Sequence, residues 1–176
     1  MSSFFRNLFG SKKTAKVTKK SISRRLELLG LEDRIVPATV TNATGVITFT
    51  LDATANETLA NLSTSVNGAI ITINAGSSIG LTGSSLPSGV TVSGSGASAV
   101  VNVDTAVFSS FAGIAVVGQA AKNDSVTVGA TGIDLSAVPG GANQSVSINL
   151  SQGGTDTLAV SGVIKTKGTG SVALNS

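Results

Sequence analysis

The chain has 176 residues and a net charge of +3, and it contains no cysteine, histidine, tryptophan or tyrosine. Without cysteine it can form no disulfide or thiolate site, and without histidine it lacks the commonest metal ligand and general base. The charge is uneven: residues 1–37 carry nine Lys/Arg against three Asp/Glu, whereas residues 38–176 carry three lysines against six acids. The positive charge therefore belongs to the first segment and gives no reason to expect nucleic-acid binding by the rest.

The first segment combines phenylalanines with basic residues. On a helix its early aromatic and leucine residues would form one apolar edge, followed by a series of lysines. Such a segment suits an anionic membrane surface, and a solvated, disordered basic tail is the alternative. No apolar run is long enough for a conventional signal peptide or a membrane-spanning helix. The residues expected to contact the membrane surface are Phe4, Phe5, Leu8, Phe9, Lys12 and Lys13.

The segment ends in LELLGLEDRIVPA, residues 26–38. This stretch resembles the N-terminal sorting motif of planctomycete extracellular and cell-surface proteins, which runs Leu-Glu, a spacer, then Leu-Glu-Asp-Arg-x-x-Pro-Ala. The spacer of residues 28–30 is longer than is usual for that motif. The matching residues are Leu26, Glu27, Leu31, Glu32, Asp33, Arg34, Pro37 and Ala38.

The resemblance implies that residues 1–38 are a targeting leader read by export machinery. It also implies a location in the cell envelope or outside the cell. Val36 and Ala38 place small residues at positions −3 and −1 of a processing site, so the leader is expected to end at Ala38 and the domain to cover residues 39–176.

Residues 39–176 carry few charges and are rich in Val, Ile, Thr, Ser and Gly, a composition that favours short strands and tight turns. Four segments of this domain read alike, and an apolar alternation precedes and follows each of them. The first apolar residues are Leu59, Val90, Val126 and Leu158 in the four segments, Ile47, Ile79, Ile114 and Val146 in the preceding strands, and Ile71, Val101, Ile133 and Val163 in the following strands.

These strands recur about every 32 residues, three to a period. The sequence therefore predicts an all-β domain built as a parallel β-helix, or β-solenoid, of about four coils. An antiparallel β-sandwich is the alternative, because regular short strands separated by turn signals fit that fold too. The leader before it is expected to be partly helical or disordered.

Little in the domain indicates chemistry. Gly94, Gly96 and Ala99 have the spacing of a dinucleotide-binding loop, but a strand-like segment follows where a helix is needed, so we interpret them as a turn. Asp124 and Asp156 share a repeat position and are weak candidates for Ca²⁺, which takes about six to eight oxygen ligands. Capping of their own turns is the alternative. We expect no catalytic residue, no cofactor and no enzyme activity.

The favoured hypothesis is an exported structural or adhesive protein of the cell surface or extracellular matrix, whose uncapped strands associate end to end with other copies. The first alternative is a glycan-binding or glycan-processing β-helix, although its acids are scattered in the sequence and aromatic residues are few. The second alternative is contact with nucleic acid or a membrane through the basic leader. Nucleic acid is the weaker of these two partners, because the domain offers no basic face.

Overall fold

The computed structural model describes residues 37–78, 80–139 and 143–176, and this part of the chain is built of β-strands with one short 3-10 turn, Gly96–Ser98. The predicted all-β class is confirmed. The leader residues from Phe4 to Lys13 and the motif residues from Leu26 to Arg34 lie outside the described residues. The strands are β1 Ala38–Ala43, β2 Val46–Thr50, β3 Thr58–Asn67, β4 Ile70–Asn74, β5 Leu81–Gly83, β6 Val90–Ser93, β7 Val100–Asp104, β8 Gly113–Val117, β9 Ser125–Val128, β10 Ile133–Asp134, β11 Ser145–Asn149, β12 Thr157–Val160, β13 Ile164–Lys165 and β14 Val172–Asn175.

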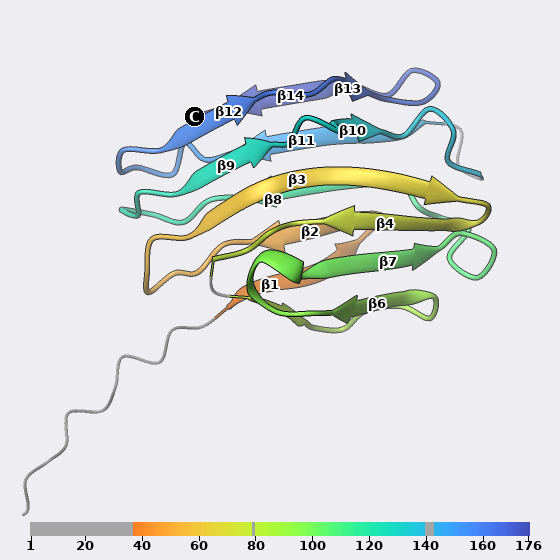
Figure 1. Cartoon of the computed structure of the whole chain (residues 1–176), viewed down its shortest axis with the longest axis horizontal. Helices are drawn as coiled ribbons and strands as arrows, with labels where there is room; N and C mark the ends of the chain where they lie inside the picture. Colours follow the sequence, from red (N-terminus) through yellow and green to blue (C-terminus); the bar gives the residue numbers. More distant parts are fainter. Residues whose placement is uncertain (1–36, 79, 140–142) are drawn as a thin grey trace, which may run out of the picture. The chain divides into compact units, whose positions relative to one another are not determined.

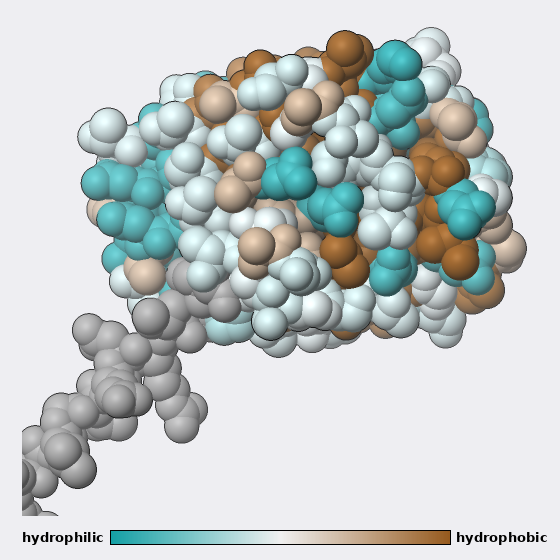
Figure 2. All heavy atoms as spheres, viewed as in Figure 1, coloured by the Kyte–Doolittle hydropathy of each residue, from teal (hydrophilic) through white to brown (hydrophobic). Residues whose placement is uncertain are grey.

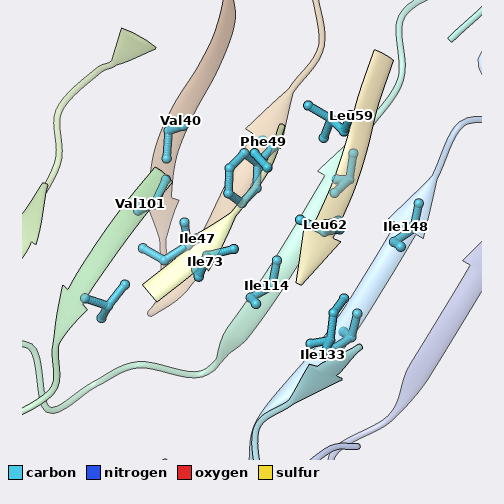
Figure 3. Close-up of a cluster of buried hydrophobic side chains, with 14 of the residues drawn as sticks. Val40, Ile47, Phe49, Leu59, Leu62, Ile73, Val101, Ile114, Ile133 and Ile148 are labelled. Atoms are coloured by element: carbon cyan, nitrogen blue, oxygen red, sulfur yellow. The ribbon is translucent and has the colours of Figure 1, made fainter. Parts of the chain in front are cut away.

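Two six-stranded mixed sheets form the described domain, and a short pair, β10–β13, stands beside them. The first sheet has the order β14-β11-β8-β2-β1-β5, and the second has the order β12-β9-β3-β4-β7-β6. The second sheet lies in front of the first in Figure 1, and buried side chains from both sheets form one apolar core. Figure 3 shows Phe49 of β2, Leu59 of β3 and Ile148 of β11 among them.

Parallel ladders connect strands that are far apart in the sequence. In the first sheet Ile47 pairs with Ile114, and Ile114 pairs with Val146, which is 32 positions later. In the second sheet β3, β9 and β12 are paired in the same way. The ladder there joins Leu59, Val126 and Leu158, again with 32 positions between the last two. In these two sets of strands, three of the four predicted positions therefore pair in the predicted register. The third predicted set is wrong: Ile71 and Val101 lie in the antiparallel strands β4 and β7, and Ile133 pairs with Ile164 and not with Val163.

The predicted second repeat is wrong. Val90 does not join the ladder of Leu59, because β6 pairs antiparallel with β7 and places Val90 opposite Val103. Strands β4 and β7 are also antiparallel, and Leu81 of β5 pairs with Ala38 of β1. Ile79, the predicted start of this repeat, lies outside the described residues. Strands β4, β6 and β7 thus pair antiparallel, as in the alternative fold, whereas β5 pairs parallel with β1, so the sheets are mixed.

Tight turns explain the antiparallel part. A two-residue turn joins β3 to β4, with Gly68 at φ 59° in its first position, as type II′ hairpins require. Between β1 and β2 both Thr44 and Gly45 have positive φ, which is the type I′ pattern. Such turns fold each strand back on its predecessor before the chain can cross to the other sheet.

Alternation along each strand accounts for the core. In β11, Val146 and Ile148 are buried while the residues between them are half-buried. Their ladder neighbours, Ile114 and Val116 in β8, point inward as well. Because parallel pairing keeps the register, each apolar side chain stacks on a similar one in the next strand.

The close approach of β8 and β11 depends on glycine. Gly113 has φ 141°, and a side-chain Cβ there would overlap the backbone carbonyl oxygen of Ser145. We expect Gly113→Ala to lower the free energy of unfolding by about 2–5 kcal/mol, combining overpacking with backbone strain. Urea denaturation measures this loss.

The matched control is Gly68→Ala. Gly68 also has positive φ, but nothing lies within 4 Å of the position of its added Cβ. Only the backbone strain of about 1–2 kcal/mol should appear there. Equal losses for the two variants would contradict the steric role of Gly113.

Candidate functional site

Three acids that are scattered in the sequence are buried together. Asp52, Glu57 and Asp124 are 3%, 0% and 1% exposed. Glu57 directly precedes β3 and Asp124 directly precedes β9, and these two strands are parallel neighbours. Asp156 occupies the same place before β12, the next strand of the sheet. We call Asp52, Glu57, Asp124 and Asp156 the carboxylate cluster.

The carboxylate oxygens of the cluster accept backbone amides of neighbouring loops. The amide of Glu57 donates to Asp124 Oδ1 at 3.1 Å, and the amide of Asp124 donates to Asp156 Oδ1 at 2.8 Å. Asp124 Oδ2 accepts the amide of Gln119 in its own loop at 2.9 Å. Asp124 therefore ties its own turn, as one interpretation of the sequence expected, and also ties the loop before it.

A second ladder runs beside the first in the opposite direction. Asn56 Oδ1 accepts the amide of Asn123 at 3.0 Å, and Asn123 Oδ1 accepts the amide of Thr155 at 2.8 Å. In each loop the residue of this second ladder comes directly before the acidic residue of the first ladder, as Asn123 comes before Asp124. Sequence analysis overlooked Asn56 and Asn123, although the repeated Asn-acid pair before a strand was the signal that could have identified them.

Glu57 is the most enclosed member of the cluster. Its Oε2 accepts the amide of Asp52 at 2.9 Å, and its Oε1 accepts the hydroxyl of Ser77 at 2.5 Å. Burial raises the pKa of Glu57 above its ordinary value of 4.5, while hydrogen bonds from Ser77 and from the backbone of Asp52 and Ala38 oppose that shift. Desolvation wins, so the carboxyl holds its proton more tightly in the folded protein.

Ser77 can serve either protonation state of Glu57. Its Oγ accepts the amide of Gly80 at 2.8 Å and also lies 2.8 Å from the carbonyl oxygen of Gly80. With Glu57 ionised, the hydroxyl donates to the carboxylate. With Glu57 protonated, the carboxyl can donate to Ser77 and the hydroxyl can turn to Gly80. Ser77 carried no signal in the sequence, because its partner Glu57 is 20 residues away.

The end of the predicted sorting motif lies inside the folded domain. Ala38 is fully buried in β1, where it pairs with Leu81, and its backbone contributes to the hydrogen bonding of Glu57. Pro37 is half-buried. Cleavage after Ala38 stays a prediction, and it would have to precede the folding of β1.

The weak metal candidates, Asp124 and Asp156, are brought next to each other. The oxygens described above are already occupied by backbone amides. Within residues 37–78, 80–139 and 143–176, no group of three His, Cys, Asp or Glu side chains has an arrangement that could hold a metal ion.

Little at the surface of the described residues fits a sugar. Asp52, Glu57 and Asp124 are too buried to reach one. The three described phenylalanines, Phe49, Phe108 and Phe111, are buried as well, so they offer no ring for stacking. The side chain of Asp134 is 41% exposed but forms a 2.8 Å ion pair with Lys165.

A second candidate site is the apolar end of the domain. Val172 and Leu174 of β14 pair with the buried Val146 and Ile148, so they point into the same core, yet they are 45% and 44% exposed. In the second sheet Val160 is 46% exposed, although its partner Val128 is fully buried. We call this end the C-terminal face; its inward-pointing residues are Leu158, Val160, Ile164, Val172 and Leu174.

Three strands border this face, each with one unpaired edge in the described structure. β12 pairs with β9, β13 with β10 and β14 with β11, and none has a strand on its other side among the described residues. Figure 2 shows hydrophobic surface along the upper edge, where Figure 1 places these strands. The C-terminal face thus combines exposed apolar side chains with exposed backbone donors and acceptors.

Comparison with protein-family models, with curated proteins and with solved structures finds no match to this chain. In the described part of the chain no helix is long and apolar enough to cross a membrane.

The raised pKa of Glu57 predicts a pH dependence of stability. A raised carboxyl pKa contributes stability that is fully present below the unfolded value near 4.5 and is lost as pH rises through the folded value. We expect the difference in free energy of unfolding between the parent chain and Glu57→Gln to decrease from acidic to neutral pH. Urea denaturation at a series of pH values measures it.

Asp134→Asn is the control with the opposite sign. The hydrogen bond from Lys165 lowers the pKa of Asp134 below 3.8, so its contribution is present above that value and is lost as pH falls. The difference in free energy of unfolding between the parent chain and Asp134→Asn should therefore increase with pH. The increase should be small, because the ion pair lies at the surface. A Glu57→Gln difference that stayed constant across pH would contradict the role given to burial.

Proposed function

We propose that this chain is an exported structural or adhesive protein of the cell surface or extracellular matrix, and that its domain self-associates through the C-terminal face. The observation that carries the proposal is the half-exposed apolar layer of β12 and β14, flanked by open strand edges. Core side chains left in water beside unpaired backbone groups favour the addition of further strands.

A β-solenoid is the architecture we propose for the parallel part of the domain. Three ladders support it: β2-β8-β11-β14, β3-β9-β12 and β10-β13. Where the repeat is regular their members recur after 31 or 32 residues, as Ile164 does after Ile133 and Leu158 after Val126. Between the loops before β9 and β12, the ladders of Asn and acidic residues also recur after 32 residues.

Export is supported by the sequence of the leader. The Leu-Glu-Asp-Arg-x-x-Pro-Ala stretch resembles a planctomycete sorting motif, and the charge changes sign directly after it. Contact of the basic segment with an anionic membrane surface fits the same route. The proposed location is the cell envelope or the exterior.

Intact-mass analysis of envelope and medium fractions from the native host tests export. We expect the protein in those fractions, shortened at its N-terminus if the leader is removed. A mass beginning at Thr39 would show that cleavage precedes folding, because folded β1 buries Ala38. A full-length chain found only in the cytoplasm would overturn the proposed export.

Self-association is tested by one charge placed on the C-terminal face. We expect the full chain to associate as its concentration rises and Val172→Lys to weaken that association by about tenfold or more, because burying one valine contributes about 1.5–3 kcal/mol. Analytical ultracentrifugation measures both.

Ile70→Lys is the matched control. Ile70 is also 45% exposed, but it lies at the start of β4 and outside the C-terminal face. Its substitution should leave association unchanged. A parent chain that stays monomeric at high concentration, or equal weakening by the two variants, would overturn the proposed self-association.

A further inference from the structure

The two ends of the sheets are not equivalent. The edge strands opposite the C-terminal face are β5 and β6, and the loop between them brings Leu86 across this end. A Cβ built at Gly83 would lie 2.6 Å from Leu86 Cδ1 and 3.3 Å from Val92 Cγ2. Both side chains are partly buried and pack against the core. Apolar side chains are therefore better covered at this end than at the C-terminal face, although β5 and β6 also have one unpaired edge each.

Charge is also distributed along the C-terminal face. Asp156 lies directly before β12, and Lys165 and Lys167 lie at and after β13, toward the other end of the strands (Figure 1). In the adjacent layer, Asp134 pairs with Lys165, the amide of Asp124 donates to Asp156, and the Lys122 ammonium donates to the carbonyl oxygen of Thr54. Asp124 and Asp156 thus make one end of the face negative, and Lys165 and Lys167 together outnumber Asp134 and make the other end positive.

We propose that self-association closes as a two-fold dimer in which the C-terminal face of one copy covers the C-terminal face of a second copy. β12 then lies antiparallel to β12 of the second copy, and β14 lies antiparallel to β14. The inference rests on the proposed self-association and names its partner and geometry. A second copy of the same chain presents the edges of β12 and β14 at the same separation as the first copy, with an apolar layer between them.

Two different two-fold axes would bring the two faces together, and the charges favour the axis that is perpendicular to the sheets. An axis perpendicular to the sheets reverses the strand direction, so the end with Asp156 meets the end with Lys165 and Lys167. An axis along the strands would place β12 against β14 of the second copy and bring the lysine ends together. Opposite charges in contact favour the first arrangement, and like charges disfavour the second.

The covered opposite end explains why association stops at two copies. Head-to-tail contact would need the end formed by β5, β6 and Leu86, where apolar side chains are already packed. A two-fold contact uses the same face on both copies and leaves no further open face. Growth into a fibre is therefore not expected.

Single-cysteine labelling of the full chain tests the geometry, since the chain contains no cysteine of its own. Nitroxides are attached at Thr157→Cys or at Val163→Cys, both exposed sites near opposite ends of the face. Six residues at about 3.3 Å each place the two sites at most about 20 Å apart. We expect a dimer by sedimentation equilibrium. Electron–electron distance measurements should give a shorter distance in mixed dimers (Thr157→Cys with Val163→Cys) than in dimers labelled at one site only.

Other results of the same experiment distinguish failure of the closed dimer from failure of self-association. A dimer whose same-site distances are the shortest would overturn the orientation. Open-ended growth, with a label at Ser88→Cys near the covered end approaching Val163→Cys of another copy, would overturn the closed dimer and leave self-association standing. A monomer at all concentrations would overturn self-association itself.

Discussion

Parallel backbone pairing between strands far apart in the sequence, 32 residues for Ile114 with Val146 and 67 for Ile47 with Ile114, is the constraint on which the rest of the structure depends. Strands β8 and β9 have no hairpin neighbour, so their amides and carbonyls are satisfied only by parallel strands from distant parts of the chain. Fixed register then stacks like side chains: Ile114 lies between Ile47 and Val146, and Val126 lies between Leu59 and Leu158. The same requirement leaves glycine at Gly113, where two backbones come too close for a side chain.

Backbone amides in the loops between the strands also need hydrogen-bond acceptors, and polar side chains supply them. The amides before β3 and β9 point at the acidic residue of the next loop, and those before β9 and β12 point at the asparagine of the previous one. These ladders let loops lie close together although they form no sheet. Burial of Glu57 is the cost, and Ser77 offsets it by offering a partner for either protonation state.

Sequence patterns predicted the all-β class and the registers of Leu59 with Val126 and of Ile114 with Val146, because alternation and repeat length are both local properties. They failed between β4 and β7. The turn at Gly68 and the predicted turns between coils have similar compositions, and only φ at one or two residues separates a hairpin from a crossover. For the candidate site, the shared position of Asp124 and Asp156 was visible. The partnership of Glu57 with Ser77 was not, since it joins unlike residues across an unlike part of the chain.

The segment from β4 to β7, where the predicted repeat failed, determines how the sheets end at β5 and β6. Had β4 to β7 continued the parallel ladders, both ends of the sheets would present half-exposed core residues, and association could extend without limit. The antiparallel strands instead turn back, and Leu86 and Val92 close the core on that side. Among the described strands the apolar residues at the other end are the more exposed: Val160, Val172 and Leu174 are 46%, 45% and 44% exposed, whereas Leu81, Leu86 and Val92 are partly buried. The proposed self-association would therefore use the end formed by β12, β13 and β14 and stop at a pair.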